Sequence, residues 1–100
     1  MTHKIKILDI YADAVLYGSK NFEVRYNDRG YQKGDTICFQ VVHDVGRRRV
    51  PVEHKLNEEQ FRITYVLTNA DGIRSGYCVL GIEKSRRFIA KSDGSIVEVK

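Results

Sequence analysis

The chain has 100 residues, of which 42% are hydrophobic and 30% charged, and its formal net charge is +4. A chain of this length has room for one hydrophobic core and therefore for one domain. Its apolar runs are far shorter than the roughly 20 residues of a membrane-spanning helix, so we expect no membrane segment. The N-terminal residues lack the apolar core of a signal peptide, which predicts a cytoplasmic protein.

Two cysteines, Cys38 and Cys78, lie inside apolar runs far apart in the sequence. They form no CxxC pair, and no histidine lies at the spacing of a metal site. This pattern predicts two buried thiols in a reducing compartment. We therefore expect neither a metal ion nor another cofactor.

Positive charge gathers in two places, at residues 47–49 and between residues 84 and 91. Each cluster can be a solvated loop that keeps the protein in solution, or a patch that binds phosphate groups. The net charge of +4 permits an anionic partner but does not require one.

The first predicted elements are a strand and a helix. Polar and apolar residues alternate over residues 3–8, which predicts a strand. Asp9 is expected to cap a helix over residues 10–17, and Gly18 to end it, because glycine tolerates the left-handed conformation. Two helical turns are not stable alone, so this helix must pack on a sheet.

A second strand is predicted over residues 22–27, where the alternation resumes. Its two faces carry different side chains, with Phe22, Val24 and Tyr26 on one and Glu23, Arg25 and Asn27 on the other. If the apolar face fills the core, the polar row faces solvent or a groove beside the helix. Turn residues follow at 27–30 and 33–35.

The second half of the chain reads mainly as strands. Residues 36–42 are largely apolar on both faces, as in a central strand or a strand of a barrel. Residues 44–57 are predicted to be a long charged connection with the least order. Further strands are expected over 60–67 and 77–83, and the tail, residues 85–100, as a hairpin around Asp93-Gly94.

Six or seven short strands and one early helix, without regular strand–helix alternation, predict a mainly β (α+β) fold. The expected architecture is a small, mostly antiparallel β-barrel with one short N-terminal helix at one end. We expect one domain over residues 1–100, with the tail hairpin as its last element, and a monomer.

Three charged side chains, those of Lys20, Glu23 and Arg25, are expected to lie within reach of one another. They can form exposed ion pairs worth about 0–1 kcal/mol. They can also recognise a nucleobase or another small polar ligand, or supply a base or nucleophile for catalysis. Composition alone favours the structural alternative.

The segment GSKNFEVR, residues 18–25, matches the G-x-K-x-x-E-x-R signature and resembles the ASCH domains of the PUA-like superfamily. The similarity extends over residues 3–83, in the order found in a small group of uncharacterised bacterial and phage ASCH-like proteins. The resemblance implies a PUA-like β-barrel whose groove beside the first helix binds RNA or a nucleotide-like ligand. The signature residues carried over are Gly18, Lys20, Glu23 and Arg25.

Further positions fit the pattern of the narrower group, namely His3, Asn27, Asp28, Arg29, Gly34 and Asp35. The ligand-binding residues implied by the resemblance are Lys20, Glu23, Arg25, Asn27, Arg29 and His3. His3 can reach the groove from the first strand, or it can be a satisfied histidine at a strand start. Tyr26 and Tyr31 are the candidates for stacking on a base.

Two alternatives to a binding module stay open. One ASCH subgroup is an amidohydrolase of acylated cytidine that pairs its lysine with a threonine three residues later. Here Glu23 stands at that position, so an enzyme would be a nucleoside- or RNA-directed hydrolase that uses Lys20 and Glu23 differently. The other alternative is a protein-interaction domain of the phage type that docks through the tail hairpin or an open edge strand.

Overall fold

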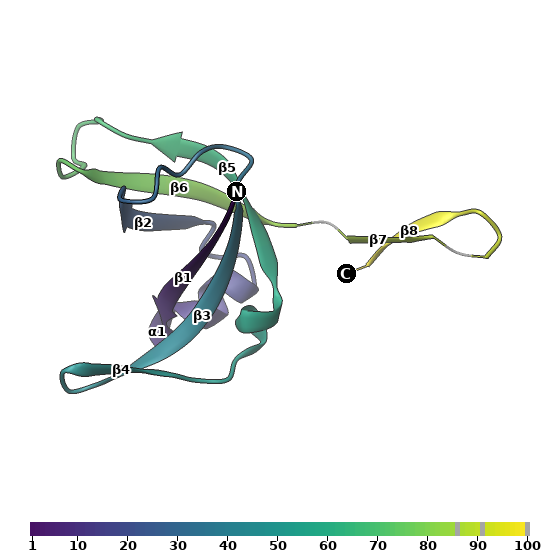
Figure 1. The fold of residues 1–100 in the computed structure, drawn as a ribbon, viewed down its shortest axis with the longest axis horizontal. Helices are drawn as coiled ribbons and strands as arrows, with labels where there is room; N and C mark the ends of the chain where they lie inside the picture. Colours follow the sequence, from purple (N-terminus) through teal and green to yellow (C-terminus); the bar gives the residue numbers. More distant parts are fainter. Residues whose placement is uncertain (86, 91, 100) are drawn as a thin grey trace.

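The structure, a computed structural model, describes residues 1–85, 87–90 and 92–99 (Figure 1). Its elements in chain order are β1 (Thr2–Leu8), α1 (Asp9–Leu16), β2 (Phe22–Tyr26), β3 (Thr36–Val45), β4 (Arg48–Pro51), the 3-10 helix η1 (Lys55–Glu58), β5 (Gln60–Leu67), β6 (Tyr77–Lys84), β7 (Arg87–Ala90) and β8 (Ile96–Val99). The predicted early helix and strand-rich remainder are therefore confirmed. No helix of the described residues is long and apolar enough to cross a membrane.

The main sheet has the strand order β1-β3-β5-β6-β2, with β4 paired to the far end of β3. The β1–β3 pair is parallel, whereas the other pairs in the described part of the chain are antiparallel. The fold is thus mostly β, with an open mixed sheet whose two edge strands are β1 and β2. As predicted, β3 is central, because it pairs with β1, β4 and β5.

The core lies on the concave face of this sheet. Ile37 and Phe39 from β3, Ile63 from β5 and Leu80 from β6 are at most 1% exposed. Alternation along each strand aims these side chains inward, and α1 closes the core with Val15. Truncating one of the largest of them to alanine typically costs about 2–5 kcal/mol, so this cluster holds the sheet in shape.

The faces of β2 are the reverse of the expected arrangement. Phe22, Val24 and Tyr26 are 44%, 56% and 58% exposed, whereas Glu23 is 5% exposed. The pairing of β2 with β6 sets Glu23 opposite the buried Leu80 and therefore on the core face. The condition considered from the sequence, that Phe22 and Val24 fill the core, is therefore not met, because the register of β2 against β6 decides which face turns inward.

Residues 44–57, predicted to be the least ordered, are regular. After β3 ends at Val45, Gly46 takes the left-handed conformation (φ +62°), and the chain returns as β4. The side chain of His54 then accepts a hydrogen bond from the N–H of Leu56 and begins η1. Charged residues occupy an exposed hairpin here, so the apolar alternation typical of a strand is missing from the sequence.

Two histidine–aspartate pairs tie α1 to the neighbouring segments. His43 Nδ1 lies 2.6 Å from a carboxylate oxygen of Asp9, and His54 Nε2 lies 2.7 Å from one of Asp13. Asp9 therefore does not cap α1 as predicted, because its carboxylate is directed to β3. The helix does end as predicted, with Gly18 in the left-handed conformation (φ +86°).

The tail forms the predicted hairpin, β7–β8, as a separate two-stranded sheet that extends away from the main one (Figure 1). The pair of β7 and β8 nearest the turn is Ala90 with Ile96, so the connection is longer than the expected two-residue turn. There the Asp93 carboxylate accepts from the N–H and hydroxyl of Ser95, which lowers the pKa of that carboxyl group. Arg86 and Lys91 of the second basic cluster lie outside the described residues.

The two cysteines are free thiols in different environments. Cys78 is buried as predicted, and burial raises the pKa of its thiol. Cys38 is partly exposed, in contrast to the prediction. Its strand alternates, so that Ile37 and Phe39 face the core and Cys38 faces outward.

Gly76 should be the least replaceable glycine of the β5–β6 connection. It has φ +84°, and a Cβ added there would lie 2.7 Å from the ring of Tyr26. Gly76→Ala should therefore lower the free energy of unfolding by about 2–3 kcal/mol, the sum of left-handed strain and a steric clash. Urea unfolding measures this loss.

Gly72→Ala is the matched control for this prediction. Gly72 has a similar φ of +86°, but nothing lies within 4 Å of its added Cβ. Its substitution should cost only the backbone strain, about 1 kcal/mol. Equal losses in the two variants would contradict the described contact between Gly76 and Tyr26.

Candidate functional site

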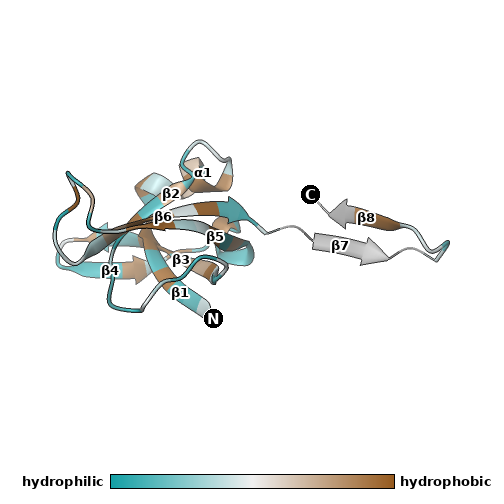
Figure 2. Ribbon diagram, turned by 90° about the horizontal axis from the view of Figure 1, so that it is seen from above, coloured by the Kyte–Doolittle hydropathy of each residue, from teal (hydrophilic) through white to brown (hydrophobic). Residues whose placement is uncertain are grey.

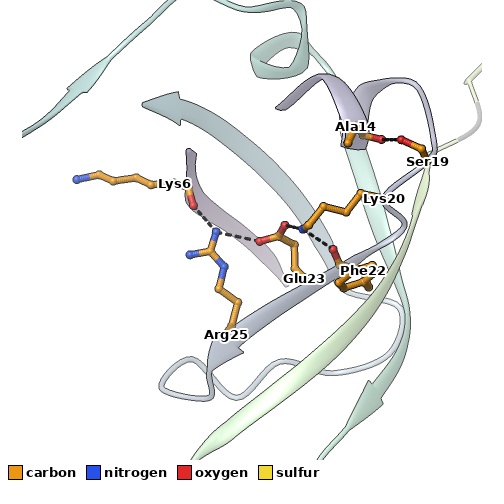
Figure 3. A network of polar contacts seen from close by, with 7 residues as sticks. All are labelled: Lys6, Ala14, Ser19, Lys20, Phe22, Glu23 and Arg25. Carbon is orange, nitrogen blue, oxygen red and sulfur yellow. Dashed lines mark hydrogen bonds and ion pairs between the residues drawn. The ribbon is translucent and has the colours of Figure 1, made fainter. Parts of the chain in front are cut away.

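A buried carboxylate between two cations occupies the core face of β2 (Figure 3). Lys20 Nζ donates to one oxygen of Glu23 and also to the carbonyl oxygen of Phe22, at 2.8 Å from the latter. Arg25 Nη2 lies 3.3 Å from the other oxygen of Glu23. Both carboxylate oxygens are thus engaged, and the trio of Lys20, Glu23 and Arg25 carries one net positive charge.

Local backbone geometry brings the trio together. Left-handed Gly18 ends α1, and the next turn is fastened to the helix because the N–H of Lys20 donates to the carbonyl oxygen of Ala14 at 2.9 Å. The Ser19 hydroxyl donates to the same oxygen at 3.3 Å. Period-two alternation then places Glu23 and Arg25 on one face of β2, beside the anchored lysine.

Arginine side chains link the two edges of the sheet. Arg25 Nη2 donates to the carbonyl oxygen of Lys6, and Arg29 Nη1 donates to that of Lys4 at 2.7 Å. Both carbonyls belong to the edge strand β1, whose other side pairs with β3. The two guanidinium groups therefore satisfy acceptors that a further strand would otherwise bind, and they cover this edge.

One donor of this network is left over. Arg25 Nε is a buried nitrogen with no hydrogen-bond partner in the described part of the chain. A buried N–H without an acceptor costs about 1–3 kcal/mol, so this nitrogen is an uncompensated cost of the network.

A pocket of about 430 Å³ lies between α1 and β2, lined by Tyr11, Lys20, Phe22, Glu23 and Val24. We call it the α1–β2 pocket. The Lys20 ammonium lies 4.9 Å from the ring centroid of Phe22 and 5.5 Å from that of Tyr11, within the range of cation–π attraction. The pocket therefore combines two aromatic surfaces with a cation, as a flat and polar or anionic ligand requires.

His3 lies elsewhere in the core. Its Nε2 is 2.8 Å from Asp35, its ring centroid is 4.7 Å from that of Tyr31, and it does not line the α1–β2 pocket. Asp35 also accepts from the N–H of Gln32 and from the N-terminal amine. The hydrogen bond from His3 is the main reason why the pKa of the Asp35 carboxyl group is lowered.

The two tyrosines that were candidates for stacking differ in exposure. Tyr31 is 6% exposed, and burial raises the pKa of its hydroxyl although Arg29 and Arg25 oppose the shift. A nucleobase therefore cannot stack on the ring of Tyr31, whereas the ring of Tyr26 is exposed. The sequence reasoning passed over Phe22 because an apolar residue at strand spacing was assigned to the core.

The remaining candidate, Asn27, lies at the end of β2. Its N–H donates to the carbonyl oxygen of Gly76 at 2.8 Å, and it lines a separate pocket with Tyr26. Of the predicted residues, the structure thus brings Lys20, Glu23 and Arg25 into one network. Within the described residues, no group of three or more His, Cys, Asp and Glu side chains is placed to hold a metal ion.

Comparison with known families adds one match. Residues 2–82 match DUF3850, described as a domain of unknown function, and the chain belongs to this family. The match ends within β6 and leaves out the β7–β8 hairpin. Among curated proteins, no sequence matches this one.

Removal of the Glu23 carboxylate should destabilise the fold. In Glu23→Ala, Lys20 and Arg25 lose their common partner, and because both are partly exposed the loss should be moderate, about 2 kcal/mol. Glu83→Ala is the matched control, since the Arg62–Glu83 pair on the same sheet is more than half exposed. That variant should lose about 0–1 kcal/mol. Equal losses in urea unfolding would contradict a buried network.

Asp35 should make stability depend on acid pH. Its pKa is lower in the folded than in the unfolded chain, so its contribution is present above about pH 3.9 and is lost as the pH falls through the lower folded value. The difference in unfolding free energy between the parent protein and Asp35→Asn should therefore be constant near neutrality and shrink below about pH 4. Urea unfolding at several pH values tests this, with Asp71→Asn, an exposed loop residue, as control. A difference independent of pH would refute it.

Proposed function

We propose that this member of the DUF3850 family is an RNA- or nucleotide-binding module whose ligand occupies the α1–β2 pocket. The observation that carries the proposal is the Lys20 ammonium between two aromatic rings, held by a buried carboxylate at the pocket wall. A base can stack on Tyr11 or Phe22 while Lys20 attracts a phosphate or carbonyl oxygen. Lysine has three donors, and two of them are bound to Glu23 and to the carbonyl of Phe22.

Glu23 has a positioning role in this proposal. Because cations engage both of its oxygens, it holds Lys20 and Arg25 in place, and the network of these three side chains behind the pocket wall carries one net positive charge. An anionic ligand is favoured by that charge, and the pocket volume of about 430 Å³ lies in the range of small-molecule sites.

The resemblance to ASCH domains of the PUA-like superfamily supports the same ligand class. Its signature residues Lys20, Glu23 and Arg25 are the ones that form the buried network. We further propose that the sheet is a PUA-like barrel, in which the arginine contacts from β2 and the loop after it to the carbonyl oxygens of β1 take the place of a strand pairing. These arginine contacts support the proposed PUA-like barrel, and they are present in the structure whether or not that proposal holds.

A hydrolase is the second candidate, favoured by the direct contact between Lys20 and Glu23. Both oxygens of Glu23 are already bound to cations of the protein, so binding is the better supported function. Incubation of nucleosides and short RNA with the protein, followed by mass spectrometry, distinguishes the two. Unchanged masses support the binding module, and a product lost in Lys20→Ala would establish the enzyme.

Titration with the four nucleoside 5′-monophosphates, followed by amide NMR at about 150 mM salt, tests the binding proposal. At least one nucleotide should shift the amides of residue 11 and of residues 20–24. Lys20→Ala should weaken the binding of that nucleotide about tenfold, since a charge-assisted contact is lost. Arg48→Ala, in the exposed β3–β4 hairpin, is the control and should have little effect. Shifts confined to residues 47–49, or none, would refute the proposal.

A further inference from the structure

The outer face of β2 and β6 carries three aromatic residues, of which Phe22 and Tyr26 are exposed and Tyr77 is partly exposed. Strand pairing sets Val24 beside Val79 and Tyr26 beside Tyr77, with Phe22 beside Gly81. The Tyr26 and Tyr77 rings meet edge to face, with centroids 5.4 Å apart. Phe22 and Tyr26 are both more than 40% exposed, so these rings form a free surface and not part of the core. Figure 2 shows the same region from above.

Two pockets lie along this face. The first, of about 380 Å³, is lined by Val24, Gly72, Ile73, Arg74, Tyr77 and Val79. The second, of about 250 Å³, is lined by Tyr26, Asn27, Thr68, Asn69, Gly76 and Tyr77. Val24 also lines the α1–β2 pocket, and Tyr77 lines both outer pockets, so the three hollows follow one another along β2.

The charge along this path is positive. Lys20 lies over Phe22 at one end, and the Arg74 guanidinium lies 6.0 Å from the ring centroid of Tyr77 near the other. Among the described residues that line the three pockets, Glu23 is the one carboxylate, and it is already paired with cations. The face therefore suits a chain that alternates flat apolar groups with negative charges.

We propose that this outer face binds single-stranded RNA, with bases stacked on Phe22, Tyr26 and Tyr77 and with a phosphate held by Arg74. Exposed aromatic rings on a sheet, flanked by cations, bind unpaired bases because every base has a π-face and the backbone is anionic. From Phe22 to Tyr26 the strand spans about 13 Å, enough for two or three bases. The inference rests on the proposed function for its ligand class and adds a second surface to the α1–β2 pocket.

The test measures fluorescence anisotropy of a labelled RNA of about eight nucleotides, free and as a blunt duplex, with the full chain. The single strand should bind more tightly than the duplex. Tyr26→Ser and Arg74→Ala should each weaken the binding of the single strand about five- to tenfold. Tyr26→Phe should retain this binding because the ring remains. Tyr17→Ser is the control, since Tyr17 is exposed and lines none of the three pockets.

The nucleotide titration, repeated on Tyr26→Ser, separates this inference from the proposed function. Nucleotide shifts at residues 20–24 with no single-strand binding would overturn the outer-face site alone. Single-strand binding that Tyr26→Ser abolishes, without nucleotide shifts, would overturn the α1–β2 pocket alone. Binding of single-stranded RNA at the outer face would be refuted if Tyr17→Ser and Tyr26→Ser weakened it equally, or if the duplex bound with equal affinity. A dimer of the protein, detected by sedimentation and dissociated by Tyr26→Ser, would also refute RNA binding at this face, because the face would then bind a second copy of the chain.

Discussion

The pairing of Glu23 with Lys20 and Arg25 is the interaction on which the rest of the candidate site depends. Burial of a lone carboxylate on the core face of β2 would be costly, and the two cations make it tolerable. The same contacts fix the lysine at the pocket wall and direct the arginine toward β1. One buried acid therefore sets the position of the cation that faces a ligand and helps to join the two edges of the sheet.

The edge strands explain why arginine occurs at positions 25 and 29. β1 presents the carbonyl oxygens of Lys4 and Lys6 on the side away from β3, and β2 is not paired with it. A guanidinium group spans such a gap because its donors lie in one plane at the end of a long side chain. Lysine could reach the same oxygens but offers a point charge, and its hydrogen bonds would be less directional.

Alternation along β2 gives this short strand two chemical faces. The inward face holds Glu23 and Arg25, and the outward face holds Phe22, Val24 and Tyr26. In most half-buried strands the apolar row turns inward, because burial of apolar surface stabilises the fold. Here the apolar row is left for solvent or for a partner, and the cost of this arrangement is the strongest physical sign that the strand has a function beyond the fold.

The sequence determined much of the secondary structure and drew attention to the three charged side chains that form the buried network. Alternation located β1 and β2, strands were also expected at β5 and β6, Gly18 marked the end of α1, and the signature pointed to Lys20, Glu23 and Arg25. Each of these follows from neighbouring residues alone, through side-chain period or backbone conformation. The exposed end of the β3–β4 hairpin was missed because it buries no apolar stripe, and the carboxylate of Asp9 was assigned to a cap because its partner, His43, is distant in the chain.

What only the tertiary structure decided is which way β2 faces. Both faces of the strand were described correctly, but a shift of one residue in its register against β6 would exchange them, and nothing local in the sequence fixes that register. It depends on groups that are distant in the chain, namely β6 and the carbonyl oxygens of β1, with which the charged row makes its contacts. Pairings between residues far apart in the chain therefore placed Glu23 inside and Phe22 outside.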